Sequence, residues 1–275
     1  MFIPDLKDTL LMENLSWEEI NEFVAGGKTT VLQYAGAVEQ HGPHLPTITD
    51  TLLAYALGER VARKLGNALV APVIRPGLSE HHIDFPGTVS LSLETFRRIV
   101  EESCESLSRH GFSNIVLISS HGGNTDTLKA ITPDISKKVA RRSNVFFLIE
   151  DRHAHEATFE RFRKKMNATI GEMGVHSGLT ETSMVLAVRP DLVDMKRARE
   201  GLVEESFYLP ENVLISQMDA FIHGIKSQID NGILGDPRRA TAELGNELLE
   251  AISEDQAIQI RKILGAINSN KRAQA

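Results

Sequence analysis

Short apolar runs alternate with amphipathic segments along most of this chain. Four runs rich in aliphatic and aromatic residues predict buried strands, at residues 29–38, 67–77, 113–120 and 144–151. Segments with apolar residues spaced by three and four predict helices over residues 15–27, 51–66, 93–110, 125–143, 156–170, 180–188 and 238–267. Buried strands that alternate with helices are typical of an α/β fold, with a mainly parallel sheet covered by helices on both faces.

Local signals refine three of these helices. Ser16 and Glu19 form a capping-box pattern at the start of the first helix, and Gly26 and Gly27 end it. Asp50 comes just before the helix at residues 51–66, where its simplest role is an N-cap. Pro133 predicts a break in the helix at residues 125–143.

Composition limits the number of domains, the partners and the location of the protein, but it does not indicate an activity. The 275 residues contain no repeat, low-complexity tract or Gly/Ser linker, so a single domain over residues 1–275 is expected. A net charge of -7 argues against a nucleic-acid partner. Charged residues near the N-terminus interrupt any signal-peptide core, and no run of about 18 apolar residues predicts a membrane span. We therefore expect a cytoplasmic protein without a membrane partner.

Cys104 is the only cysteine, which rules out an intrachain disulfide. It lies in the amphipathic segment at residues 93–110, with no electropositive loop around it in the sequence. A buried, unreactive thiol is favoured there over a nucleophile.

Polar residues that carry chemistry follow the predicted strands. In parallel α/β sheets the ligand site lies beyond the carboxyl ends of the strands. The first strand is followed by Glu39, His41 and His44, and the second by Ser79, Glu80, His81 and His82. The third strand is followed by His121, and the fourth by His153 and His155.

Glu39 and His41 are two residues apart. On an extended strand both side chains would lie on one face, about 7 Å apart, which suits two ligands of one metal or of a close metal pair. Capping by Asp50 would leave its second oxygen free to bind or bridge metals. His44 lies between Pro43 and Pro46 and is expected to shape the loop or contact substrate rather than bind metal.

Two further motifs offer candidate ligands. In SSHGGN, at residues 119–124, the glycines allow an anion pocket, but the segment has neither a G-x-G-x-x-G pattern nor a P-loop lysine. A metal ligand at His121 is favoured, and Gly122 lets substrate approach the backbone. In HSGLTETS, at residues 176–183, His176 and Glu181 alone indicate only a capped helix start, and they gain meaning beside the other motifs.

Nitrogen and oxygen donors suit zinc, manganese, iron or cobalt. Two divalent metals bridged by Asp50 would lower the pKa of a shared water, so that hydroxide forms near neutral pH. This hydroxide would attack a carbonyl carbon. Hydrolysis of a C–N bond then needs an acid for the leaving nitrogen, and the imidazole of His176 suits that role. Ser79, Glu80 and His81 are candidates for substrate binding, although Glu80 and His81 also suit a hydrogen-bonded pair within the loop.

The combination of GAVEQHGPHLPTITD, HIDFPGTVSL, SSHGGN and HSGLTETS resembles the creatininase family, in order and spacing, across residues 31–188. This resemblance implies a three-layer α/β/α sandwich, two divalent metals (zinc, manganese or iron) per subunit, a homohexamer and a small-molecule substrate. It implies metal ligation by Glu39, His41, Asp50 as the bridge, and His121. His176 would be the catalytic acid/base.

The sequence departs from creatininase proper at two places. A ligating glutamate of the creatinine-cleaving enzymes corresponds here to Gly123, and Glu181, water or a weak second site are the alternatives for the missing ligand. The tryptophans that surround creatinine are absent, because the single tryptophan is Trp17 in an N-terminal helix. A flat ring would then lack stacking partners.

We therefore expect a metal-dependent amidohydrolase that cleaves a small cyclic or linear amide by metal-activated water, with a substrate other than creatinine. A hydrolase of a sugar-like or inositol-derived ketone, cleaving a C–C or C–O bond, is the alternative. A non-catalytic metal-binding subunit is the third hypothesis.

Overall fold

The sheet contains four parallel strands in the order β2-β1-β3-β4. The computed structural model describes residues 9–149, 152–208 and 218–274. Its strands are β1 (Thr30–Ala35), β2 (Ala68–Val70), β3 (Asn114–Ser119) and β4 (Asn144–Phe147). All four predicted strands are present, and each is shorter than its apolar run. The parallel arrangement confirms the expected sheet.

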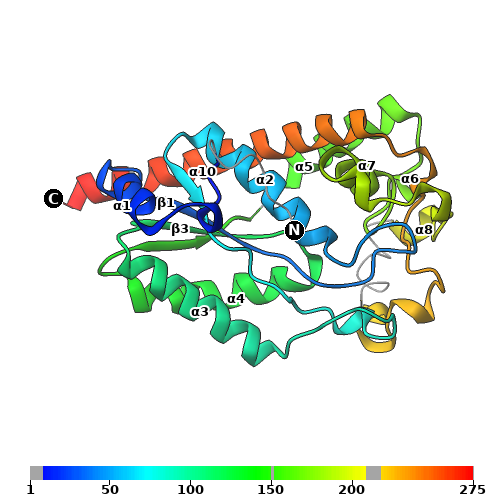
Figure 1. The fold of residues 1–275 in the computed structure, drawn as a ribbon, viewed down its shortest axis with the longest axis horizontal. Coiled ribbons are helices and arrows are strands. Elements are labelled where there is room, and N and C mark those ends of the chain that lie inside the picture. The colour runs from blue at the N-terminus through cyan, green and yellow to red at the C-terminus, as the bar shows by residue number, and fades with distance from the viewer. Residues whose placement is uncertain (1–8, 150–151, 209–217, 275) are drawn as a thin grey trace.

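Helices cover both faces of this sheet. In Figure 1, α2 and α10 lie above the strands and α3 and α4 lie below them. The longer helices are α1 (Trp17–Ala25), α2 (Thr49–Leu65), α3 (Leu93–Arg109), α4 (Gly122–Val139), α5 (Arg152–Met166), α7 (Leu179–Val188) and α10 (Ala242–Gln274). Short helices are η1 (Met12–Asn14), η2 (Glu80–His82), α6 (Ile170–Met173), η3 (Pro190–Leu192), η4 (Met195–Arg197), α8 (Glu205–Tyr208), η5 (Ile225–Ser227) and η6 (Pro237–Arg239). The expected three-layer α/β/α arrangement is therefore confirmed.

Helix α4 shows one correction, because it continues through Pro133 without a break. A proline inside a helix costs about 3 kcal/mol through the lost hydrogen bond and the steric clash. Apolar side chains on both sides of it are buried in one core cluster, including Leu128, Ile131, Ile135 and Val139. Each contributes roughly 1.5–3 kcal/mol by burial, which outweighs the proline penalty. The capping box at Ser16 and Glu19 is present as predicted.

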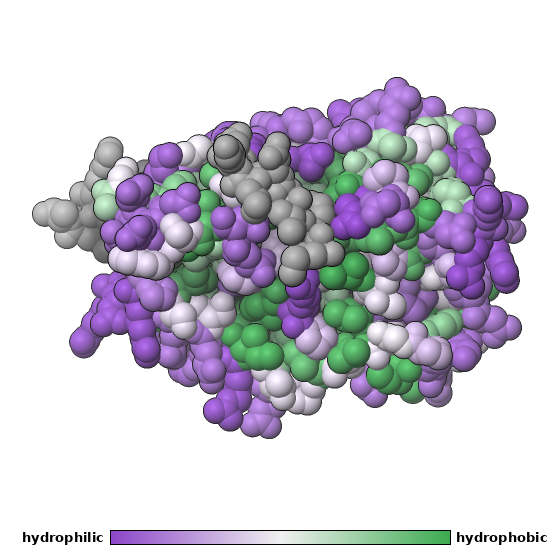
Figure 2. All heavy atoms as spheres, viewed as in Figure 1, coloured by the Kyte–Doolittle hydropathy of each residue, from purple (hydrophilic) through white to green (hydrophobic). Residues whose placement is uncertain are grey.

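The outer surface is mixed in character. Figure 2 shows hydrophilic residues over the ends of this face, and hydrophobic residues gathered near its middle and lower right. Among the described residues, no helix is both long and apolar enough to cross a membrane.

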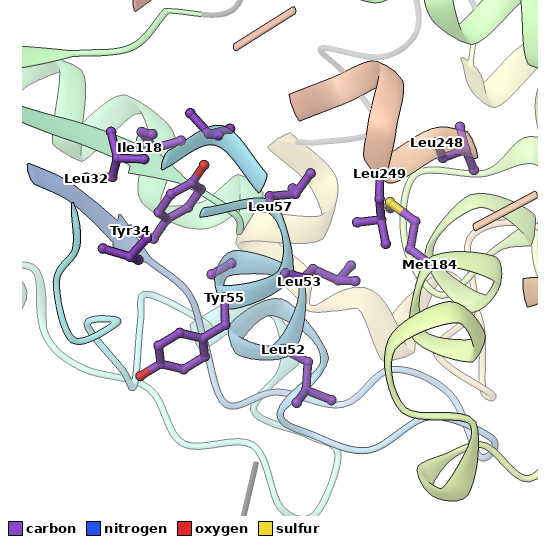
Figure 3. Close-up of a cluster of buried hydrophobic side chains, with 14 of the residues drawn as sticks. Leu32, Tyr34, Leu52, Leu53, Tyr55, Leu57, Ile118, Met184, Leu248 and Leu249 are labelled. Carbon is purple, nitrogen blue, oxygen red and sulfur yellow. The ribbon is translucent and has the colours of Figure 1, made fainter. Parts of the chain in front are cut away.

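Alternation along the strands divides the core into two clusters. Leu32 and Tyr34 of β1 face the cluster formed with α2, α7 and α10, whereas Val31 and Ala35 face the cluster formed with α3 and α4. Successive strand residues point to opposite faces, so a strand buried on both faces must be apolar at nearly every position. Figure 3 shows the first cluster, with Met184 packed beside Leu249 and the leucines of α2. Cys104 is fully buried in the second cluster, as expected, and burial raises its pKa to about 12.

Helix α10 approaches α7 closely where α10 carries a glycine. A Cβ atom at Gly245 would lie 1.8 Å from the backbone carbonyl oxygen of Ser183 in α7. Gly265, further along the same helix, has no atom within 4 Å of the corresponding position. The close contact therefore depends on a missing side chain at Gly245.

We expect Gly245→Ala to lower the free energy of unfolding by at least about 1–3 kcal/mol, because the added methyl group forces α10 away from α7. The matched control Gly265→Ala should raise it by up to about 1 kcal/mol through helix propensity. Urea unfolding of both variants measures the difference. A Gly245→Ala variant as stable as the parent protein would contradict this packing.

Candidate metal centre

The candidate residues meet at the carboxyl edge of the sheet. The strand order reverses direction between β1 and β3, since β2 lies on one side of β1 and β3 on the other. In open α/β sheets such a reversal opens a crevice beyond the strand ends, where ligands bind. Glu39 and His41 follow β1, and His121 follows β3 at the start of α4. The side chains of His153 and His155 lie outside the described residues.

Asn124 fastens the loops around this crevice. Its side-chain Nδ2 donates to the carbonyl oxygens of Ala35 and Gly36, and its Oδ1 accepts from the backbone N–H of Leu78. The side chain is fully buried, so each of these bonds satisfies a polar group that would otherwise be costly. Asn124 therefore joins the segments that follow β1, β2 and β3.

Asp50 lies between two groups of candidate ligands. Its Oδ1 is 3.4 Å from His41 Nε2, and its Oδ2 is 3.5 Å from His121 Nδ1. Glu181 Oε2 lies 4.0 Å from the same His41 nitrogen. The two oxygens of one carboxylate thus face two separate sets of donors, which is the geometry that a bridging ligand needs.

The capping role predicted for Asp50 is wrong. Helix α2 starts at Thr49, its N-cap is Ile48, and that cap makes no side-chain hydrogen bond. Asp50 is therefore inside the first turn. A carboxylate there is still favoured by the partial positive charge of the helix N-terminus.

Glu39 lies on the other side of the centre. Its Oε1 is 3.2 Å from His121 Nδ1, 3.5 Å from His82 Nε2 and 3.8 Å from His176 Nδ1. The strand argument for its placement is wrong, because β1 ends at Ala35. The irregular segment after β1 is held instead by backbone bonds, from Glu39 N–H to the Thr47 carbonyl and from Val89 N–H to the Val38 carbonyl.

Glu181 reaches the centre through the turn after His176. Ser177 has a φ of 58°, a left-handed conformation that is uncommon for residues other than glycine. Its backbone N–H donates to Glu181 Oε2 at 2.5 Å. Backbone bonds pair His176 with Leu234. The turn thus places His176 and Glu181 on neighbouring sides of His41.

Hydrogen bonds to the histidines orient their free nitrogens toward the centre. His41 Nδ1 lies 3.2 Å from the Glu39 carbonyl, and His121 Nε2 lies 2.9 Å from the Leu78 carbonyl. Carbonyl oxygens only accept, so these nitrogens carry the hydrogens and the opposite nitrogens present lone pairs. Such bonds are the usual support of metal-binding histidines.

Several buried polar atoms at the centre have no hydrogen-bond partner in the protein. Among the described residues these atoms include Glu39 Oε2, His41 Nε2 and Asp50 Oδ2. Buried polar groups are almost always paired, and an unpaired one costs about 1–3 kcal/mol. Three overlapping groups bring their ligand atoms within 4.8 Å of one another: Glu39, His41 and His176; Glu39, His81 and His121; and His41, Asp50 and Glu181. These residues fit a divalent metal in three respects: their donor atoms are of the right type, they lie close together, and several of them have no hydrogen-bond partner.

The pKa values of the buried histidines also indicate that this site favours positive charge. Burial lowers the pKa of His41, but Asp50, Glu181 and Glu39 outweigh burial and raise it to about 10. His121 behaves alike, with a pKa of about 9 caused by Glu39 and Asp50 against burial. Burial and the neighbouring carboxylates raise the pKa of Glu181 to about 7, against the opposing effect of His41. The carboxylates therefore favour positive charge at this point, from protons or from metal cations.

At Gly123, which the resemblance matched to a ligating glutamate, the structure leaves no room for a side chain. A Cβ atom there would lie 2.3 Å from the Leu78 carbonyl oxygen and 2.5 Å from His121 Nε2. These two atoms make the hydrogen bond that orients His121. Gly123 thus permits this bond, and the carboxylate nearest to His41 besides Asp50 is Glu181, 4.0 Å from His41 Nε2.

Gln40 is a part of the centre that the sequence reasoning missed, and His82 was named after the second strand without a role. Gln40 Nε2 lies 2.9 Å from His82 Nδ1 and 3.0 Å from the Gly232 carbonyl, and its Oε1 accepts from Gly42 N–H. The Gln40 backbone carbonyl lies 2.9 Å from His176 Nε2. Gln40 therefore fixes both rings, so that His82 Nε2 carries hydrogen toward Glu39 and His176 Nδ1 keeps its lone pair.

The other predicted residues divide between cavity and interior. His81 and Gly122 line a cavity of about 490 Å³ that opens over Glu39, His121 and His176. Ser79 is fully buried with its Oγ 3.5 Å from His121 Nε2, and Glu80 is exposed outside the cavity lining, so the structure does not support substrate contact by either. His44 is buried, with Nε2 2.9 Å from Thr182 Oγ1, and it does not line the cavity.

Aromatic side chains line the cavity, although Trp17 does not. Trp17 is 75% exposed on α1, whereas Phe207, Tyr208 and Phe221 border the cavity. The expectation that a flat ring would find no aromatic surface is therefore wrong. The aromatic residues come from a part of the chain that has no recognisable motif.

The chain matches the family model described as "Creatininase: Creatinine amidohydrolase" over residues 13–259. It is 31% identical to the mycofactocin precursor peptide peptidase of Mycolicibacterium smegmatis over 84% of each chain. It is 31% identical to the creatinine amidohydrolase of Pseudomonas putida, covering 70% of this chain and 76% of that one. A 3-dehydro-scyllo-inosose hydrolase of Thermotoga maritima is 26% identical, over 86% of this chain and 78% of that one.

Solved structures give the same result. The crystal structure of creatinine amidohydrolase (creatininase) matches with a TM-score of 0.76 and 27% identity, over 93% of this chain and 98% of that one. A structure described as the manganese form of creatininase matches with a TM-score of 0.74 and 26% identity, over the same shares.

Adjacent glycines allow a matched test of the His121 geometry. We expect Gly123→Ala to weaken metal binding by about 10- to 100-fold, the usual effect of disturbing a bond that supports a metal ligand. Gly122→Ala should bind metal as the parent does, because no atom lies within 4 Å of its Cβ position. Metal content after dialysis against graded chelator, with circular dichroism as a check of folding, measures both. Equal retention by the two variants would contradict the geometry.

Proposed function

The chain belongs to the creatininase family of metal-dependent hydrolases, and we propose that it cleaves the C–N bond of a small cyclic or linear amide with the help of two divalent metal ions. The observation that carries this proposal is the position of Asp50. Its two carboxylate oxygens face two different histidines, each accompanied by a further carboxylate. A single structural ion would not need this divided arrangement.

The distances between the donor atoms divide them into two groups. Glu39, His121 Nδ1 and Asp50 Oδ2 would hold one ion, and His41 Nε2, Glu181 and Asp50 Oδ1 would hold the other. These nitrogen and oxygen donors suit zinc, manganese or iron. Two such ions would supply Lewis acidity, which polarises a carbonyl group and lowers the pKa of water.

His176 is the proposed proton carrier. Burial and the neighbouring His41 hold its pKa well below the usual value, so the ring is neutral at neutral pH. Its Nε2 is bonded to the Gln40 carbonyl, which leaves Nδ1 to accept a proton at the cavity floor and to give it to the leaving nitrogen. His176 would therefore act first as a base that accepts a proton at Nδ1, and only then as the acid that protonates the leaving nitrogen.

The relatives support amide chemistry over the alternatives. Both relatives that are 31% identical carry names that denote cleavage of C–N bonds, an amidohydrolase and a peptide peptidase. The inosose hydrolase, at 26% identity, is the relative that favours the ketone alternative. A non-catalytic subunit would not need His176 at the floor of a cavity beside the metal ligands. The homohexamer remains a prediction.

A panel of amides tests the proposal. Protein freed of metal by chelator and reloaded with zinc or manganese is expected to release ammonia, an amine or formate from at least one simple amide or peptide. The same preparation without metal is the control. Cleavage of inosose-type ketones alone, or no turnover with any metal, would overturn the proposal.

Two substitutions separate metal binding from proton transfer. His176→Ala should retain metal and lose roughly 10²–10⁴-fold in kcat, the usual size of a general acid–base contribution. Asp50→Asn should lose metal and activity together, because a neutral amide is a poor bridging ligand. Metal analysis beside steady-state kinetics distinguishes them. A His176→Ala variant with full activity would remove His176 from the mechanism.

A further inference from the structure

The cavity over the metal centre has two unlike sides. Its floor is polar and is formed by Glu39, His121 and His176 together with His81 and His82. A second set of lining residues is apolar and comes from α8, from residues 220–234 and from the residue before His176; it consists of Val175, Phe207, Ala220, Phe221, Ile225 and Leu234. We call these six residues the apolar wall. A bound molecule would therefore meet both polar groups and hydrocarbon.

The apolar wall is built into the fold. Ala220, Ile225 and Leu234 are buried in one small cluster, against which Phe207 also packs. Leu234 is joined to His176 by backbone hydrogen bonds, from Leu234 N–H to the His176 carbonyl and from His176 N–H to the Leu234 carbonyl. The wall is therefore held at a fixed position beside the proposed proton carrier.

The rim of the wall is exposed. Phe221 is 59% exposed and Val175 is 63% exposed, and the Phe221 ring lies 4.6 Å from the ring of His81. Figure 2 shows hydrophobic surface at the lower right of the molecule, where η2 and the helical residues 218–223 lie in Figure 1. Apolar surface beside a polar pocket commonly marks a binding site.

Charges in the cavity restrict the ligand further. Among the described residues that line it there is no lysine or arginine, and Asp126 is the only carboxylate besides Glu39. The Tyr208 hydroxyl donates to the Leu202 carbonyl, and Gln228 Nε2 donates to Asp219. The wall thus offers no positive charge to a carboxylate or phosphate and few free polar groups to a polyol.

We propose that the substrate is an amide with an apolar side group next to the scissile bond, of the size of an isobutyl or benzyl group, that packs on the apolar wall. The rest of the substrate is uncharged or carries an amine, which Asp126 would attract. This inference rests on the proposed function for its metal centre and specifies the substrate class of that site. It disfavours acidic substrates and polyhydroxylated ketones.

Hydroxamates test the apolar wall without requiring turnover, because they bind metals directly. Zinc- or manganese-loaded protein is titrated by calorimetry with acetohydroxamate, 4-methylpentanohydroxamate and the monohydroxamate of succinic acid. We expect the isobutyl-bearing compound to bind about 10- to 100-fold more tightly than acetohydroxamate, from the burial of four additional carbons. The succinic compound should bind most weakly, since no lysine or arginine among the described lining residues pairs with its carboxylate.

Neighbouring residues provide matched variants. Phe221→Asp should reduce the preference for the isobutyl compound to less than about a third of the parent value, because one side of the apolar wall becomes charged. Ile222→Asp should keep the preference, since Ile222 is 67% exposed and lies outside the cavity lining. Both positions are exposed, so neither change disrupts the core.

The outcomes separate the two proposals. Equal binding of the first two hydroxamates, or tightest binding of the succinic compound, overturns the apolar-wall inference even if amides are cleaved. The expected ranking without cleavage of any amide supports the wall and overturns the proposed function. Failure of all three compounds to bind overturns both.

Discussion

The need to balance negative charge at one buried point organises this structure. Glu39 and Asp50 are almost completely buried, Glu181 joins them beside His41, and among the described residues neither a lysine nor an arginine pairs with any of the three. Unpaired buried carboxylates are costly, so the site must take up protons or cations. The carboxylates raise the pKa values of His41 and His121, which favours positive charge on both rings. Divalent ions would supply the same positive charge together with Lewis acidity.

The fold brings candidate ligands from distant parts of the sequence together. The reversal of strand order opens the crevice between β1 and β3, and Asn124 joins the segments that follow three strands. Gln40 then links this region to His176, which is 136 residues away, and to His82. The candidate metal centre is therefore held in place by buried amide side chains.

Much of this arrangement could be predicted from the sequence, but not always for the right reason. Apolar runs and helical spacing gave the parallel sheet, and the motifs gave residues that the structure brings together. The spacing argument for Glu39 and His41 assumes a strand that ends at Ala35, and the capping argument for Asp50 assumes a cap that α2 does not use. Gln40, the apolar wall and the role of His82 could not be predicted, because they arise from contacts between distant segments. No local periodicity records such contacts.

Anomalous diffraction from crystals of the manganese- or zinc-loaded protein would show whether Asp50 bridges two metal ions. Two peaks are expected about 3.5–4 Å apart, the usual spacing of paired catalytic metals. One should lie beside Glu39 and His121, the other beside His41 and Glu181, and each should contact one oxygen of Asp50. A single peak, or metal bound without Asp50, would contradict the account.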